Sequence, residues 1–172
     1  LPLSPKLVAA ALKRWKGDTS RILHRQPYRI MELHGAGFMT ADQLAKHLGV
    51  GERSNPRIDA GLQYVLGQAA SQGHTAPSAE SIVGRSADLL DLPSELIESR
   101  LRHQLDEGAI RSIEVDGHQR LAAAELYDDA HRFAEVICRL ALSHGPALDS
   151  QQIERRIGLA NEALGFELAG AQ

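Results

Sequence analysis

The residues with the clearest chemical potential lie in a short glycine-containing segment, residues 33–38 (Leu-His-Gly-Ala-Gly-Phe). Two glycines separated by one residue permit a tight turn with positive φ, and they leave backbone N–H groups uncovered by side chains. Where such a turn leads into a helix, the first N–H groups and the helix dipole favour an anion. This geometry suits one phosphate of a nucleic-acid backbone. A plain turn without a ligand is the alternative interpretation.

The phosphate would be held by backbone N–H groups of the turn and of the helix that follows it. Residues 40–43 (Thr-Ala-Asp-Gln) fit a capping box, with a hydroxyl at the N-cap and Gln three residues later, so the helix is expected to begin at Thr40. Each further cation nearby is alternatively a solvated surface charge. The expected phosphate-binding residues are Gly35, Ala36, Gly37 and Thr40, assisted by Arg29 and Lys46, with Arg25, Arg53 and Arg57 as additional candidate cations.

Charge is divided unevenly along the 172 residues, although the net charge is only −3. Residues 1–57 hold ten Lys/Arg against four Asp/Glu, a net charge of +6, and residues 58–172 carry −9. A basic front half is typical of a surface that faces a polyanion. The alternative interpretation is two solvated surfaces of different sign.

Other chemistries find little support in the sequence. Cys138 is the only cysteine, which excludes a disulfide framework within the chain and a cysteine-based zinc site. The eight histidines show no metal-ligand spacing, and neither a phosphate loop nor a catalytic constellation is present. We therefore expect no metal, no cofactor and no catalytic residue in this chain. No run approaches the roughly 18 apolar residues of a membrane span and no leader pattern is present, so the cytoplasm is the expected compartment.

Short helices are expected to position the glycine turn, which makes residues 1–73 a helix-hairpin-helix region. Such a module grips DNA without reading its sequence. Pro in the first turn, hydroxyl or Asx caps and terminal glycines mark the boundaries. The expected helices run from Ser4-Pro5 to Gly17, from Thr19 or Ser20 as the cap, from near Pro27, from Thr40 to Leu48, and from Asn55-Pro56 to Gly73.

A change from helical to alternating periodicity marks a second region at residues 76–124. A helix through Ile82 and a helix over 93–107 precede two short strands joined by Asp116-Gly117, a two-residue hairpin signal. This order predicts a winged-helix-like region. The helix over 93–107 is too acidic to suit a duplex groove, and scaffolding is the better interpretation. Its charged residues are Glu95, Glu98, Asp106 and Glu107 against Arg100 and Arg102.

The remaining residues, 125–172, are expected to be a helical linker. The predicted fold class is mainly α, with the helix-hairpin-helix region followed by the winged-helix-like region and its one small β-hairpin. A last helix is expected over Ser150 to Leu164. A long helix from about Leu126 to Leu142 is expected to bury Phe133, Val136, Ile137, Cys138 and Leu140.

Several segments resemble the RecD-like helicases, the exodeoxyribonuclease V alpha-subunit family. The resemblance covers nearly the whole chain and keeps the order of elements. Two departures are Ala36, where the family usually has a branched apolar residue, and the absence of further hairpin copies upstream. The segments that carry the resemblance are 27–30 (Pro-Tyr-Arg-Ile), 35–45 (Gly-Ala-Gly-Phe-Met-Thr-Ala-Asp-Gln-Leu-Ala), 57–66 (Arg-Ile-Asp-Ala-Gly-Leu-Gln-Tyr-Val-Leu), 73–75 (Gly-His-Thr), and 126–127 (Leu-Tyr) with the following helix.

The resemblance implies an accessory region that precedes the motor of an ATP-dependent, 5′-to-3′ DNA helicase acting in recombination and repair. ATP and Mg²⁺ would then be cofactors of the parent protein, whose motor domain and DNA backbone would be the partners of this region. The resemblance also places Gln172 where the family has an adenine-contacting Gln. The alternatives are a scaffold that packs on the motor without touching DNA, and a sequence-selective winged-helix regulator.

Overall fold

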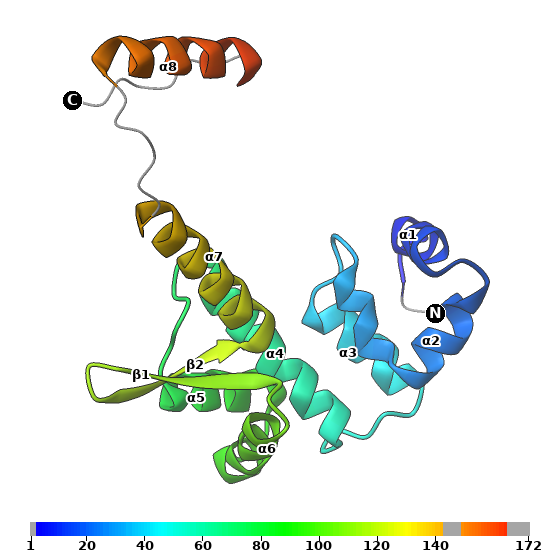
Figure 1. Ribbon diagram of the computed structural model, residues 1–172. Helices are drawn as coiled ribbons and strands as arrows, with labels where there is room; N and C mark the ends of the chain where they lie inside the picture. Colours follow the sequence, from blue (N-terminus) through cyan, green and yellow to red (C-terminus); the bar gives the residue numbers. More distant parts are fainter. Residues whose placement is uncertain (1–2, 143–148, 165–172) are drawn as a thin grey trace. The chain divides into compact units, whose positions relative to one another are not determined.

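The computed structural model of the chain describes residues 3–142 and 149–164. Residues 1–130 form one compact unit and residues 131–172 a second. The fold is mainly helical with one small antiparallel sheet, which confirms the predicted fold class (Figure 1). The elements are α1 (Pro5–Trp15), η1 (Lys16–Asp18), α2 (Thr19–Arg25), η2 (Pro27–Glu32), α3 (Phe38–His47), α4 (Asn55–Ser71), α5 (Ala79–Leu90), α6 (Ser94–Asp106), β1 (Ile110–Val115), β2 (His118–Ala123), α7 (Ala124–Leu142) and α8 (Ser150–Leu164).

Local signals explain how the first helices begin and end. Ser4 is the N-cap of α1, and its Oγ accepts a hydrogen bond from the Leu7 N–H at 3.3 Å. The expected hydroxyl cap of α2 is wrong, because its N-cap is Asp18. The Thr19 hydroxyl instead donates to the backbone carbonyl of Lys16 at 2.7 Å. The 3₁₀ turn η1 leads directly into α2, at the place where a side-chain cap was expected.

Helix α4 is the central element of the compact unit and packs against parts on both sides of it. It contacts η2 and α3 on the N-terminal side and α5, α6 and β2 on the other (Figure 1). Gly61 allows α4 and α5 to approach closely, since a Cβ at this position would lie 2.8 Å from Leu90 Cδ1. The predicted boundary between residues 73 and 76 falls in the loop after α4, within this one unit.

The hairpin of β1 and β2 completes a winged-helix arrangement whose first helix is α4. Asp116 and Gly117 form its turn with φ of 52° and 73°, as a two-residue hairpin requires. The loop before α5 adds a short third segment to the sheet: the Leu121 N–H donates to the Pro77 carbonyl at 2.9 Å, and Ser78 bridges Arg120. Helix α4 therefore packs against elements on both sides of the predicted boundary.

Helix α7 differs from the expectation in its burial. The apolar residues expected to be buried are exposed, so the predicted buried face of this helix is wrong. The helical periodicity is present, but the side chains expected on the buried face are exposed. Across the described ranges, no helix combines the length and the apolar character needed to cross a membrane. The residues that were expected to be buried and are exposed are Phe133, Val136, Ile137, Cys138 and Leu140.

Candidate nucleic-acid interface

The glycine segment forms a type II turn between η2 and α3. The Ala36 N–H donates to the Leu33 carbonyl at 3.1 Å, and Gly35 occupies the third position with φ +89°. This position of a type II turn demands positive φ, which favours glycine. Leu33 and Ala36 are buried and anchor the turn, whereas Gly35 and Gly37 are exposed. The turn thus presents its glycines outward on a fixed base.

Gly37 is the N-cap of α3, so the helix begins three residues earlier than the capping box predicted. Phe38 opens the helix and is 1 % exposed, and its ring stacks on Tyr28 with 6.1 Å between ring centroids. This aromatic burial fixes the start of the helix. Thr40 is consequently the third residue of the first turn and not its cap.

The N–H groups at the start of α3 are available to an anion. The first i to i−4 bond of the helix runs from the Ala41 N–H to the Gly37 carbonyl at 3.2 Å. The N–H groups of Gly37, Phe38, Met39 and Thr40 precede it and have no partner within the helix. Gly37 has an ordinary extended backbone with φ −89°, and a Cβ there would meet no atom within 4 Å. The fold itself therefore does not require glycine at position 37.

The two cations expected to assist are engaged elsewhere. The Arg29 Nε donates to Glu32 Oε1 at 2.6 Å, and its guanidinium lies 5.7 Å from the centre of the Trp15 ring. Lys46 Nζ lies 3.5 Å from Asp42 Oδ2, near the C-terminal end of α3. At a rise of about 1.5 Å per residue, Lys46 is about 12 Å along the axis from Phe38. The structure brings together Gly35, Ala36, Gly37 and Thr40, and it separates Lys46 from them.

Arg57, expected as a surface cation, is buried and belongs to the core. Its Nε donates to Asp42 Oδ1 at 2.8 Å and its Nη2 donates to Asp42 Oδ2 at 3.1 Å. The Tyr28 hydroxyl donates to the same carboxylate at 2.9 Å. The sequence shows one signal of this network, an acidic residue between Ala41 and Leu44 on an otherwise apolar stripe.

Electrostatics keep this buried network ionised. Burial by itself raises the pKa of Asp42, but the hydrogen bonds from Arg57 and Tyr28 and the nearby positive charges outweigh it and hold that pKa below its ordinary value. Burial and the hydrogen bond to Asp42 raise the pKa of Tyr28. The phenol therefore stays a donor and the carboxylate an acceptor at neutral pH.

A comparison with known proteins bears on the first 76 residues of the chain. Residues 1–76 match the family model described as the HHH domain of the ATP-dependent RecD2 DNA helicase. Residues 1–76 are a RecD2-type helix-hairpin-helix domain. No curated protein matched the chain in the comparison. The family match agrees with the resemblance over this region, and it ends in the loop between α4 and α5.

The part that follows the RecD2-type domain offers α6 as a second candidate element. Arg100 on α6 pairs with Asp59 of α4, and its Nη2 lies 2.6 Å from Asp59 Oδ2. This pair removes one of the two arginines of α6 from the set that could meet DNA. The remaining charge of the helix is mainly acidic, which agrees with the scaffolding interpretation.

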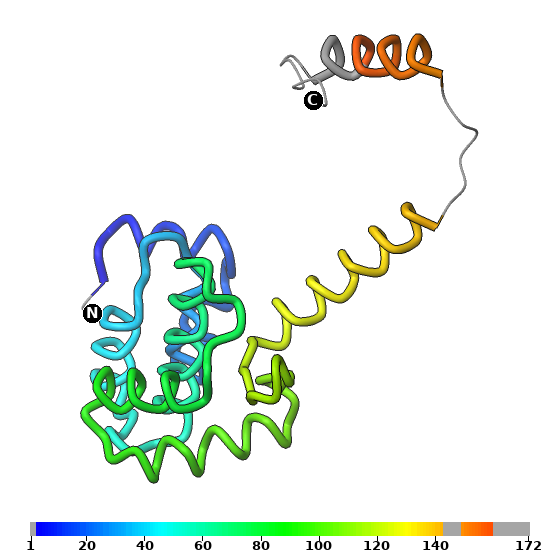
Figure 2. The backbone as a smooth tube through the Cα atoms, turned by 90° about the vertical axis from the view of Figure 1, so that its left-hand side faces the viewer, coloured from blue at the N-terminus to red at the C-terminus, as the bar shows by residue number. Residues whose placement is uncertain are grey.

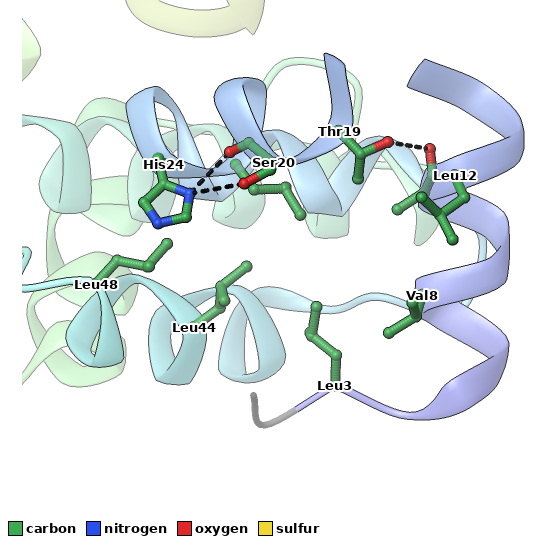
Figure 3. Close-up of a pocket in the computed structure, with 10 residues that line it drawn as sticks. Leu3, Val8, Leu12, Thr19, Ser20, His24, Leu44 and Leu48 are labelled. Atoms are coloured by element: carbon green, nitrogen blue, oxygen red, sulfur yellow. Dashed lines mark hydrogen bonds between the residues drawn. The ribbon is translucent and has the colours of Figure 1, made fainter. Parts of the chain in front are cut away.

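An apolar pocket lies within the RecD2-type domain, between α1, α2 and α3 (Figure 3). Leu3, Val8, Leu12 and Leu44 are among the apolar residues that line it, and His24 Nδ1 is within hydrogen-bond distance of the Ser20 carbonyl, at 2.8 Å. Such a wall does not suit a phosphate. No group of histidine, cysteine and acidic side chains suited to a metal occurs among the described residues. Gln172 lies outside the described residues.

Proposed function

We propose that this chain is a DNA-binding accessory region of an ATP-dependent, 5′-to-3′ helicase, and that it binds the DNA backbone without sequence preference. The observation that carries the proposal is the pair of exposed glycines, Gly35 and Gly37, before the start of α3, in a domain that matches the RecD2 HHH family. The N–H groups at this turn can donate to phosphate oxygens, supported by the helix dipole.

The absence of sequence preference follows from the donors themselves. Backbone N–H groups that hold phosphates position a protein on DNA but carry no information about the bases. Gly35, Ala36 and Gly37 carry no polar side chain that could reach a base edge. Arg25 and Arg53 are exposed and could add electrostatic attraction that depends on salt.

A charge placed at the turn tests the proposal. Asp is a favourable N-cap residue, so the helix is expected to stay folded in Gly37→Asp. Its carboxylate accepts hydrogen bonds from the first N–H groups of α3 and repels a phosphate. Binding to short duplex and single-stranded oligonucleotides is measured against salt concentration. The matched control is Gly51→Asp, because Gly51 is exposed, its added Cβ would meet no atom within 4 Å, and the charge change is the same. Equal affinity for the two variants would contradict the proposal.

The second candidate function is a scaffold that packs on a motor domain without touching DNA. The exposed apolar residues of α7 favour it, because an apolar stripe on a helix is the usual surface for packing against another element. A longer protein that contains the motor separates the two functions. If it shows no DNA affinity in this region even at low salt, the scaffold replaces the DNA-binding function.

The wider role stays part of the proposal. ATP and Mg²⁺ would be the cofactors of the motor domain in the parent protein, and Gln172 would contact the adenine of that ATP. The parent protein would act in DNA recombination or repair in the cytoplasm. Residues 1–172 alone are expected to show no ATP hydrolysis. Clear turnover by this chain would overturn that expectation.

A further inference from the structure

A polar cavity lies on the other half of the compact unit, between the loop that follows α4, the start of α5 and strand β2. Its volume is about 470 Å³. The lining carries three basic side chains, three hydroxyl groups and no acidic residue. The residues that line it with polar side chains are His74, Thr75, Ser78, Ser81, Arg85 and Arg120.

The two arginines of this cavity lack a carboxylate partner, unlike the other buried or half-buried arginines of residues 3–130. Arg57 forms a salt bridge with Asp42, and Arg100 forms one with Asp59. Arg85 donates only to the Gln68 side-chain oxygen, at 3.4 Å, and Arg120 makes no ion pair with any residue that the structure describes. Both residues are half-buried, and neither charge is balanced by a carboxylate among the described residues. An anion would supply the missing partner.

The backbone holds the walls of the cavity in place. The bond from the Leu121 N–H to the Pro77 carbonyl and the bridge between Ser78 and Arg120 fasten β2 to the loop before α5. Arg120 therefore faces the loop from a paired strand. The Ser78 Oγ already accepts from the Ser81 N–H, so the side chains, and not the end of α5, carry the site.

The surface of α4 lies between a residue that precedes the glycine turn and an arginine of the cavity. Met31, in the 3₁₀ turn before the glycine turn, lines a shallow depression together with Gln68 and Ser71 of α4. Gln68 in turn bonds Arg85. The glycine turn and the loop after α4 also lie toward the same side of the compact unit in both views (Figures 1 and 2).

We propose that the cavity of Arg85 and Arg120 binds a second phosphate of the same DNA backbone that the glycine turn holds. This inference rests on the proposed DNA binding. In this proposal the winged-helix half contacts DNA through the α4–α5 loop and β2. Helix α6 does not take part in the contact. The two arginines would share one phosphate, because they line a single cavity.

The test compares two double variants of the full chain by salt titration with a duplex oligonucleotide. R85Q/R120Q is expected to reduce the slope of log affinity against log salt by about 0.9, the value for one phosphate, and to weaken binding roughly tenfold at low salt. R102Q/R111Q, with the same charge change on exposed residues of α6 and β1, is expected to keep the wild-type slope. R85K/R120K should retain most of the binding. Thermal melting checks that all variants are folded.

The outcomes separate the two proposals. If Gly37→Asp weakens binding while R85Q/R120Q keeps the slope and affinity of the wild type, the second site is overturned and the proposed function stands. If the two double variants weaken binding equally, the effect is general charge, and the second site is also overturned. If the wild type binds no DNA, both proposals are overturned. Inorganic phosphate serves as a competitor, and displacement of DNA by it at micromolar concentration would indicate a free-phosphate site instead.

Discussion

The Arg57 guanidinium on α4 donates hydrogen bonds to both carboxylate oxygens of Asp42 on α3. Its Nη1 also donates to the Leu90 carbonyl at the end of α5, at 3.0 Å, so Arg57 links three helices. Arg57 and Asp42 are each 5 % exposed. The hydrogen bond to Leu90 ties α4 of the RecD2-type domain to α5 of the winged-helix half. It supplies one physical reason why residues 1–130 behave as a single unit.

Removing one member of this pair should destabilise the whole compact unit. Asp42→Ala leaves a buried guanidinium without its counter-charge, and breaking such a pair costs about 3 kcal/mol of unfolding free energy. Urea denaturation of the chain measures it. Arg21→Ala, which breaks the exposed pair with Asp18, is the control and should change the free energy of unfolding by less than about 1 kcal/mol. Equal losses would show that the buried network has no special role.

Acid should weaken the fold through the same carboxylate. The pKa of Asp42 lies below its ordinary value in the folded chain, so its pairing contributes stability above about pH 4, the unfolded value, and loses it as pH falls through the folded pKa. Asp42→Asn cannot titrate. The difference in unfolding free energy between wild type and Asp42→Asn should therefore shrink as pH falls below about 4. A constant difference from neutral to acid pH would contradict this assignment.

The two glycines of the turn should respond differently to substitution. Gly35→Ala places a side chain at φ +89° and should cost about 1–2 kcal/mol of unfolding free energy. Gly37→Ala adds a Cβ in ordinary backbone and open space, so its loss should stay below about 1 kcal/mol. Thermal melting of both variants measures the contrast. The opposite order would mean that the turn is not type II.

Two glycines of α4 provide a matched test of its packing against α5. Gly61→Ala pushes a Cβ to 2.8 Å from Leu90 Cδ1, and such overpacking should cost about 1–3 kcal/mol of unfolding free energy. Gly67→Ala in the same helix meets no atom within 4 Å, so the higher helix propensity of Ala should stabilise the chain by up to about 1 kcal/mol. Chemical denaturation of both variants gives the signs. A stabilising Gly61→Ala would contradict the close α4–α5 contact.

Local chemistry was predictable wherever a residue's own backbone decided the outcome. Ser4-Pro5 begins α1 as expected, and Asp116-Gly117 turns the hairpin because both residues accept positive φ. The start of α3 was not predictable from caps, because burial of Phe38 moves it ahead of the capping box. Long-range packing outweighs a cap, which contributes only about 1 kcal/mol.

The sequence by itself determined the type and order of the elements, the glycine turn and the basic front half, because these depend on residues a few positions apart. Tertiary structure alone decided which arginines are paired with a carboxylate and which are available to bind an anion. Arg57 is buried against Asp42, Arg100 is paired with Asp59, and Arg85 and Arg120 meet in one cavity without a carboxylate. The partners of each arginine come from distant segments, up to 41 residues away for Arg100, so no local pattern of charge could distinguish them.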